Sequence, residues 1–132
     1  MLEINFKTDK KHDMIDITEK VNSKIKDIKE GVALVFTPHA TAAIIINENY
    51  DPNVCVDILN FLNKAIPEGR WLHDKVDNNA AAHIKAAILG PSENVIIENG
   101  KLKLGTWQSL MFVELDGPRE RRVIIKIIRN HN

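Results

Sequence analysis

The amino-acid sequence predicts one α+β domain that spans residues 1–132. The length of 132 residues suits a single core, and a composition of 44% apolar and 27% charged residues is that of an ordinary globular protein. Stretches with helical periodicity are inserted among stretches typical of strands, and the last third of the chain indicates an antiparallel run of strands. No repeat and no long linker divides the chain.

The first part of the chain predicts a hairpin followed by a short helix. In residues 2–8, "LEINFKT", apolar and polar side chains alternate, and "MIDIT" at 14–18 is expected to pair with them across the polar turn at 9–13. Thr18 can then cap an amphipathic helix that ends at Gly31. We therefore expect two half-buried strands and one packed helix here.

Two apolar runs and a helix follow. The runs "VALVFT" at 32–37 and "AAIIIN" at 42–47 are short and rich in β-branched residues, which favours buried strands over helices. After them, Asp51 is a suitable N-cap and Pro52 fits the first helical position. Apolar residues at helical spacing then continue as far as Pro67, so a second helix is expected to end there.

The rest of the chain predicts one more helix and four strands. Residues 67–78 are irregular, and an alanine-rich helix follows that Asn78 or Asn79 can cap and that Gly90 stops. The strands are "NVIIENG", "LKLGTWQ", "LMFVELD" and "RRVIIKII", with "ENGK" and "DGPR" as turn signals.

Charge and cysteine content exclude several classes of protein. Eighteen basic residues balance eighteen acidic ones, which argues against nucleic acid or an anionic membrane as the main partner. Cys55 is the only cysteine, so no intrachain disulfide can form, and its place on the apolar stripe of its helix indicates a packing role.

No stretch approaches the ~20 apolar residues of a membrane span. We therefore expect a cytoplasmic protein.

The chain has five histidines, namely His12, His39, His73, His83 and His131. We expect His12, in a charged turn, and His131, at the terminus, to be solvated. The other three come from separate segments and could supply neutral imidazoles to a divalent ion, zinc or magnesium, with one position open for substrate or water. Because no HxH or HxxxH pair is present, the spacing also fits core histidines that bind a backbone carbonyl.

Two of these histidines occupy positions where chemistry is expected. His39 ends a buried strand beside Pro38, which stiffens the backbone, and His83 shares a helix face with Asn79 four residues earlier. We therefore expect His39 and His83 to reach one site, with His73 or an acid nearby.

Two carboxylates lie in or beside apolar strands, where a charge is costly unless it is paired. Glu48 follows the run 42–47, and Glu114 interrupts "LMFVELD". In that setting the pKa of Glu114 could be raised, so that it acts as an acid or a base. A position at the edge or on the solvent face of the strand is the alternative.

Arginines and an aromatic residue could bind a phosphorylated, flat molecule. Arg119, Arg121 and Arg122 follow the "DGP" turn and could hold a phosphate or pyrophosphate, or could belong to a solvated hairpin. Trp107 and Gln108 could hold a flat heterocycle, or Trp107 could fill the core.

Four ordered motifs carry a family resemblance: "TPHATAAIIINENYDPNV", "HDKVDNNAAAHIKAAILG", "GKLKLGTWQ" and "ELDGPRERRV". Together they resemble the YjbQ family, also called UPF0047. The resemblance implies a mixed, largely antiparallel, barrel-like sheet flanked by three helices, a homotrimer, and a polar pocket built from the motifs. On this basis we interpret both polar ends of the run 42–47 as bordering a pocket.

The resemblance places ten residues at motif positions of the family, namely His39, Asn47, Glu48, Asn49, Asp77, Asn79, His83, Trp107, Gln108 and Glu114, with His73 a less distinctive match. Together with the chemistry of the residues above, these positions assign the expected roles. The expected catalytic residues are His39, Glu48, Asp77, His83 and Glu114; the expected substrate-binding residues are Asn47, Asn49, Asn79, Trp107, Gln108 and Arg119; and the expected metal ligands are His39, His73 and His83.

Some members of this family are named secondary thiamine-phosphate synthases. In that reaction a thiazole phosphate displaces pyrophosphate from an aminopyrimidine, and cations or donors must stabilise the departing phosphates. The expected function is therefore a transferase of this type that acts on a small phosphorylated substrate, with this reaction as its main or a side activity. Two alternatives remain open: a metal-dependent hydrolase of a small phosphate ester, and a non-catalytic metabolite-binding trimer.

Overall fold

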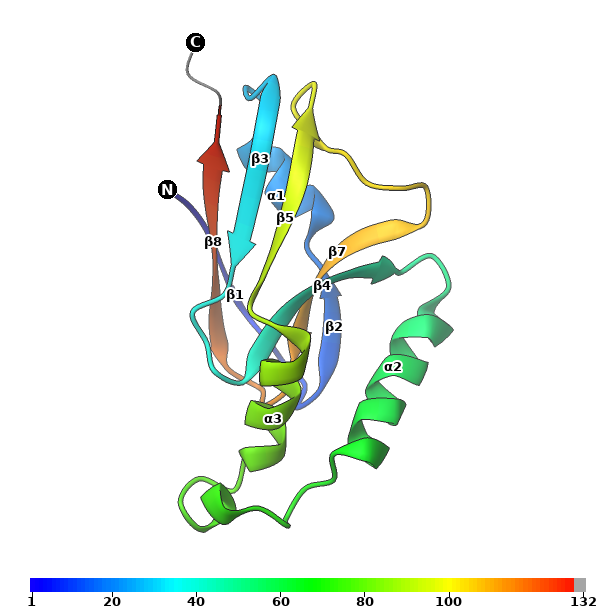
Figure 1. Cartoon of the computed structure of the whole chain (residues 1–132), viewed down its shortest axis with the longest axis vertical. Helices are drawn as coiled ribbons and strands as arrows, with labels where there is room; N and C mark the ends of the chain where they lie inside the picture. Colours follow the sequence, from blue (N-terminus) through cyan, green and yellow to red (C-terminus); the bar gives the residue numbers. More distant parts are fainter. Residues whose placement is uncertain (130–132) are drawn as a thin grey trace.

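A computed structural model describes residues 1–129, so residues 130–132, including His131, lie outside the described part (Figure 1). The strands are β1 (Leu2–Lys7), β2 (Asp13–Asp16), β3 (Glu30–Phe36), β4 (Ala42–Glu48), β5 (Ser92–Glu98), β6 (Lys101–Leu102), β7 (Gln108–Glu114) and β8 (Glu120–Ile128). The helices are α1 (Thr18–Lys24), α2 (Pro52–Ala65), the short 3-10 helix η1 (Leu72–Lys75) and α3 (Ala80–Leu89).

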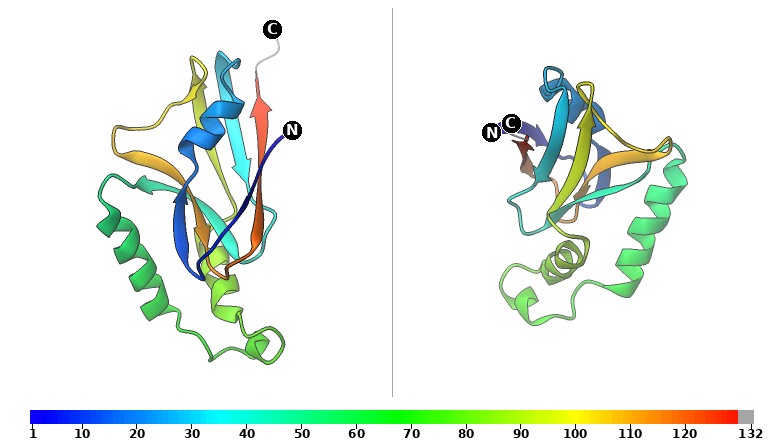
Figure 2. Two further views of the ribbon diagram at one scale, coloured as in Figure 1. Left: turned by 180° about the vertical axis from the view of Figure 1, so that it is seen from behind. Right: turned by 45° about the horizontal axis from the view of Figure 1, so that its top comes forward.

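The strands form two antiparallel sheets that enclose the main core. The larger sheet has the order β1-β8-β3-β5-β6 and the smaller one β2-β7-β4. Figure 2 shows α1 on the inner side of the curled larger sheet, whereas α2 and α3 lie on the far side of the smaller one. The predicted α+β class with a barrel-like, largely antiparallel sheet and three flanking helices is confirmed.

The main core lies between the two sheets and is closed by α1. Phe112 of β7 is fully buried and packs edge-to-face on Phe6 of β1, with ring centroids 5.0 Å apart. Val21 of α1 and Ile25 at its end are also fully buried in this cluster. Burying each such side chain contributes about 1.5–3 kcal/mol, so the contact between sheets and α1 is the main source of stability.

The predicted hairpin of the first two strands is wrong. β1 pairs with β8 and β2 pairs with β7, so the turn between β1 and β2 carries the chain from one sheet to the other. Thr8 fixes this crossing, because its backbone N–H donates to the Arg119 carbonyl at 2.9 Å. Alternation of side chains determines which face of a strand is buried, but it does not select the partner strand.

Two other expected boundaries differ in the structure. The first helix ends at Lys24, with Ile25 as its C-cap, rather than at Gly31, and Thr18 is its first residue, whose hydroxyl accepts the Leu110 N–H at 2.9 Å. Gly31 belongs to β3, at a φ of +150° where a Cβ atom would meet the Ile128 carbonyl at 2.7 Å. Of the stretch "LKLGTWQ", only Lys101–Leu102 and Gln108 are in strands.

The two longer helices begin and end where their capping residues predict. The Asp51 side chain accepts the Asn53 N–H at 2.9 Å, with Pro52 as the first residue of α2. Helix α3 lies between Asn79 and Gly90, although its first N–H, from Ala80, donates to Asp74 and not to the Asn79 side chain. Among residues 1–129, no helix combines the length and the apolar character that a membrane span requires.

Candidate functional site

The candidate residues gather most densely at a pocket where three segments meet. The loop between β3 and β4, the start of α3 and the turn between β7 and β8 enclose a volume of about 730 Å³, lined by 38–41, Asn79, His83 and 118–121. We call it the basic pocket. It brings together four residues that the sequence predicts for the site, His39, Asn79, His83 and Arg119.

A second hollow adjoins the basic pocket on the side of β1. Its volume is about 500 Å³, and it shares His39 and Arg121 with the basic pocket while adding Lys7 and Arg122. The two hollows together carry four cationic side chains, namely Lys7, Arg119, Arg121 and Arg122, against one carboxylate, Glu120. Three of these cations are ion-paired, Arg119 with Asp116, Arg121 with Glu114 and Arg122 with Glu3, so an anion would bind to the N–H groups that these pairs do not use.

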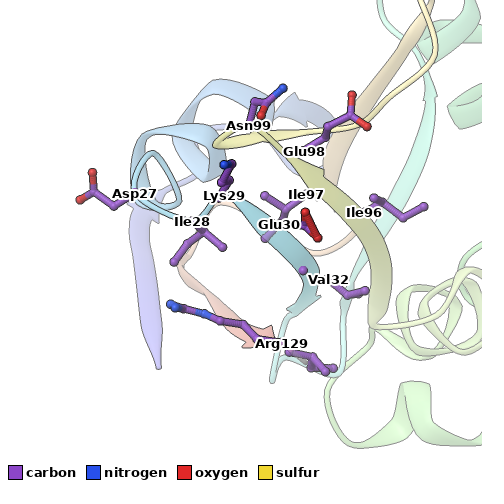
Figure 3. A pocket seen from close by; sticks show the side chains of 12 residues that line it. Asp27, Ile28, Lys29, Glu30, Val32, Ile96, Ile97, Glu98, Asn99 and Arg129 are labelled. Carbon is purple, nitrogen blue, oxygen red and sulfur yellow. The ribbon is translucent and has the colours of Figure 1, made fainter. Parts of the chain in front are cut away.

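A further hollow of about 680 Å³ lies at the opposite end of the larger sheet (Figure 3). Its walls come from the start of β3 and the ends of β5 and β8. They include apolar residues such as Val32 and Ile96, and the charged residues are Asp27, Lys29, Glu30, Glu98 and Arg129. None of the residues predicted for the site lines it. We therefore place the candidate site in the basic pocket.

His39 is held as a neutral ring. Its Nε2 accepts the backbone N–H of Arg122 at 2.9 Å, so the ring proton must lie on Nδ1. Burial lowers the pKa of His39, and the positive charges of Arg121 and Arg122 lower it further. A neutral imidazole with its Nδ1–H free is a hydrogen-bond donor that keeps this role at neutral pH.

We expect an NMR titration of the His39 ring to give a pKa below its ordinary value of 6.5. Because the folded pKa is lowered, the neutral ring contributes stability above pH 6.5, and this contribution is lost as the pH falls through the folded pKa. A His39→Ala variant should therefore lose less stability than the wild type on acidification over this range. Titration of the ring at or above 6.5 would contradict the assignment.

Arg119 is held at the rim of the basic pocket by Asp116. Its Nε donates to the Asp116 carbonyl at 2.8 Å and its Nη2 to the carboxylate at 2.9 Å. Burial raises the pKa of Asp116, but hydrogen bonds from Asn79 and Arg119 outweigh burial and keep the pKa below its usual value. The Asn79 amide nitrogen donates to the same carboxylate at 2.8 Å, while its Oδ1 is buried with no partner.

Beneath the pocket, Glu114 and Arg121 form a buried ion pair. Their side chains are 0% and 3% exposed. Arg121 Nε donates to Glu114 at 2.8 Å, Nη2 also donates to Glu114, and Thr8 donates to the same carboxylate at 2.6 Å. Nη2 further donates to the Thr41 carbonyl at 3.2 Å. The pair joins β7, β8 and the loop that carries His39.

The expected raised pKa of Glu114 is wrong. Burial alone raises the pKa, but hydrogen bonds from Arg121, Thr8 and the Asp116 N–H lower it by more, so the carboxylate stays charged. Its oxygens already accept four donors. This geometry favours a positioning role for Glu114, which orients Arg121, over the proton transfer predicted from the sequence.

His83 is in contact with a second histidine outside the pocket lining. The rings of His73 and His83 meet edge-to-face with centroids 4.9 Å apart, and His73 Nε2 lies 3.5 Å from the Asp77 carboxylate. His73 and Asp77 are both well exposed. The expected proximity of His73 to His83 is therefore present, and an acid, Asp77, lies beside His73.

The predicted three-histidine metal site does not fit this arrangement. Across residues 1–129, no three His, Cys, Asp or Glu side chains are grouped as a metal ion would require. The rings of His73 and His83 contact each other edge-to-face, and His39 Nε2 already accepts the Arg122 N–H.

The remaining predicted residues form a separate group at the other end of β4. This distal cluster consists of Asn47, Glu48, Asn49, Trp107 and Gln108, together with Tyr50, which was not predicted and whose ring contacts Trp107; it forms because Glu48 of β4 pairs with Gln108 of β7. Side chains there are held by local hydrogen bonds. Asn47 accepts the Glu48 N–H at 2.7 Å, and Gln108 accepts the Gly105 N–H at 2.8 Å.

The motif residues therefore do not form one pocket within a chain. His39 precedes the first residue of β4, Ala42, and Glu48 is its last. A seven-residue strand spans roughly 20 Å, which is longer than a small substrate. The polar residues at the two ends of β4 therefore lie apart, and Figure 1 shows this strand running from beside α3 to the loop that precedes α2.

Three residues that line or support the basic pocket were not predicted from the sequence. Asp116 lies in the "ELDGPRERRV" motif and orients both Asn79 and Arg119, and Thr41 lies in the first motif and binds Arg121. Their positions within these motifs could have identified Asp116 and Thr41 as candidates for the site. Thr8 lies outside all four motifs and 106 residues from Glu114, so no local pattern indicated it.

Comparison with known proteins identifies relatives along nearly the whole chain. A family model described as "UPF0047 protein YjbQ-like" matches residues 2–130. A UPF0047 protein of Archaeoglobus fulgidus is 47% identical over 128 residues, which make up 96% of this chain and 100% of the relative. The UPF0047 protein YugU of Bacillus subtilis is 44% identical over 127 residues, or 95% of this chain and 96% of the relative.

Two solved structures agree closely with the fold. A YjbQ/UPF0047 family protein from Clostridium acetobutylicum matches with a TM-score of 0.92 at 50% identity, covering 97% of this chain and 100% of that one. A protein from Sulfolobus solfataricus, described as of unknown function, matches with a TM-score of 0.91 at 37% identity, covering 97% of this chain and 95% of that one. These similarities establish ancestry and fold, and the descriptions name no reaction.

Proposed function

The chain belongs to the UPF0047 family of YjbQ-like proteins, and from its basic pocket we propose that it is an enzyme acting on a small phosphorylated substrate. The observation that carries the proposal is the meeting of His39, His83 and Arg119, from three separate segments, around one pocket of about 730 Å³. A volume of this size suits a small-molecule ligand.

In the proposed complex, Arg119 and His39 bind the phosphate group. The guanidinium is planar and is oriented by Asp116, so its remaining N–H groups can bind phosphate oxygens with little loss of side-chain entropy. The neutral His39 contributes its Nδ1–H as a further donor. Arg121 adds positive charge from beneath the pocket, although Glu114 balances part of it.

The reaction that we propose in finer detail is transfer of the thiamine-phosphate-synthase type. The thiazole nitrogen forms a bond to the methylene carbon of the aminopyrimidine, the bond from that carbon to pyrophosphate oxygen breaks, and pyrophosphate leaves with the electron pair. Arg119 and His39 would stabilise the charge that develops on the leaving group. The role of His83 is to donate a hydrogen bond or a proton to the departing pyrophosphate.

Ligand binding tests this proposal before any substrate is known. We expect calorimetric titration with inorganic pyrophosphate to give a dissociation constant that rises by roughly 10–100-fold in Arg119→Ala, because a hydrogen bond to a charged group contributes about 1.5–3 kcal/mol. Arg129→Ala is the matched control, since Arg129 lines the hollow in Figure 3. Equal weakening in both variants, or none in Arg119→Ala, would contradict the assignment.

Product analysis separates the proposed activity from its alternatives. Thiamine phosphate and pyrophosphate that form only when both the thiazole phosphate and the aminopyrimidine pyrophosphate are present support transfer. Inorganic phosphate released from a single ester supports a hydrolase, and binding without turnover supports a metabolite-binding protein. The homotrimer and the cytoplasmic location that the sequence leads us to expect stay predictions.

A further inference from the structure

The hollow beside the basic pocket offers binding groups that the proposed reaction leaves free. We call it the β1 hollow; its volume is about 500 Å³, and it is lined by 5–7 of β1, by His39 and by 120–122 of β8. His39 and Arg121 line both this hollow and the basic pocket, so the two spaces adjoin along one wall. A molecule bound in one of them therefore lies beside a molecule bound in the other.

The register of β1 and β8 gathers these binding groups on one face of the larger sheet. Asn5 lies opposite Arg122, and Lys7 lies opposite Glu120. Directly opposite residues of an antiparallel pair point to the same side of the sheet, as do residues two apart along a strand. Lys7 and Arg122 are therefore diagonal neighbours with Cβ atoms roughly 7 Å apart. Two long cationic side chains at this spacing can both donate to one phosphate group.

The cations of the β1 hollow are less engaged than those of the basic pocket. In the described part of the chain, Lys7 is exposed and forms no ion pair. Arg122 is paired with Glu3, but the two groups are 3.6 Å apart and their side chains are 46% and 40% exposed, so solvent screens the pair. Glu3 and Glu120 balance the two cations in number. An anion is therefore recognised here by directed N–H groups rather than by net charge.

Arg122 is held in place by the loop that carries His39. Its backbone N–H donates to His39 Nε2 at 2.9 Å, and its carbonyl accepts the Thr37 hydroxyl at 3.0 Å. Arg119 of the basic pocket precedes Arg122 by three residues, so their Cα atoms lie no more than roughly 11 Å apart. Two fixed cations at this separation suit two anionic groups that belong to two substrates in contact.

We propose that the β1 hollow binds the phosphate monoester of a second substrate while the basic pocket holds the pyrophosphate of the first. Lys7 and Arg122 donate to the phosphate oxygens, and the Asn5 amide adds a neutral donor. This inference rests on the proposed function, because a transfer between two phosphorylated substrates needs two anion sites and the basic pocket supplies one. Binding both anions side by side places the reacting groups of the two molecules near each other.

Calorimetry with two anions tests the second site. Wild-type protein is loaded with one equivalent of inorganic pyrophosphate and is then titrated with inorganic phosphate, which represents the monoester. The same titration is made with Lys7→Ala, with Glu120→Gln and with the control Lys126→Ala. Lys126 is exposed on the same face of β8 as Arg122 but lines neither the β1 hollow nor the basic pocket.

We expect phosphate to bind the loaded wild type with a stoichiometry of one. Its dissociation constant should rise by roughly 10–100-fold in Lys7→Ala, because a hydrogen bond between charged groups is lost. Glu120→Gln removes a carboxylate that repels the anion, so the constant should fall. Lys126→Ala should change it by less than about twofold, since Lys126 lies more than a Debye length of about 10 Å from Arg122.

The outcomes separate this inference from the proposed function. If phosphate binds only in place of pyrophosphate, or if Lys7→Ala and Lys126→Ala weaken it equally, the second site is refuted and the proposed function stands. If wild type does not bind pyrophosphate, the proposed function fails, and phosphate is titrated into the free protein. Weaker binding in Lys7→Ala than in Lys126→Ala then supports the β1 hollow as a phosphate site, whereas equal or absent binding overturns it.

Discussion

Replacing Glu114 with alanine is expected to reduce the free energy of unfolding by about 3–5 kcal/mol, because the substitution leaves the Arg121 charge buried without its partner. The Arg121 side chain is 3% exposed, so water cannot replace the lost carboxylate. Thr8 and the Asp116 N–H lose an acceptor as well. Urea unfolding followed by circular dichroism measures the effect, which is a large share of the stability of a domain of this size.

Two comparisons test the cause of this loss. Glu3→Ala removes the carboxylate of the exposed pair with Arg122, at 3.6 Å, and should cost less than about 1 kcal/mol. The double variant Glu114→Leu with Arg121→Met removes both charges and should recover much of the stability. If Glu114→Ala reduces the free energy of unfolding by less than about 1 kcal/mol, the Glu114–Arg121 pair does not hold the turn between β7 and β8 against the loop that carries His39.

The second large effect is expected for turnover. Replacing His83 with alanine should lower the rate by roughly 10²–10⁴-fold, the range that a positioned acid or base supplies, while the fold stays intact. His83 lines the pocket from a helix whose other early residues are mainly alanines, so the ring contributes more to the site than to the core. The assay uses thiazole phosphate and aminopyrimidine pyrophosphate, and the thermal midpoint is recorded in parallel.

Cys55→Ala is the control for this variant. The thiol is buried against Met111, with the two sulfur atoms 3.7 Å apart, and burial raises the pKa of the thiol. Its removal should cost roughly 1 kcal/mol of stability through a small cavity and leave turnover nearly unchanged. Loss of activity in Cys55→Ala together with full activity in His83→Ala would point to thiolate chemistry.

Local signals predicted much of the fold. The ends of α2 and α3 follow from Asp51, Asn79 and Gly90, because capping depends on residues adjacent in sequence. The pairing of β1 with β8 could not be predicted in this way. The predicted β1–β2 pair and the observed β1–β8 pair both agree with the alternation of side chains in β1. Only packing across the whole core selects between these two partners.

The candidate site was predicted in its parts but not in its arrangement. His39, Asn79, His83 and Arg119 meet as expected because a strand end, a helix start and a turn converge. The sequence did not show that Trp107 and its neighbours lie on a different surface from these residues. A motif gives the order of residues along the chain, but not which end of a strand each of them occupies in the fold. The strand β4 places them at opposite ends.

A crystal structure of the protein with inorganic pyrophosphate tests the central claim most directly, namely that the basic pocket binds the phosphate of the substrate. The account predicts pyrophosphate within hydrogen-bond distance of the Arg119 guanidinium and of His39 Nδ1. Pyrophosphate bound instead in the hollow between β3, β5 and β8, or an empty basic pocket at saturating concentration, would contradict it.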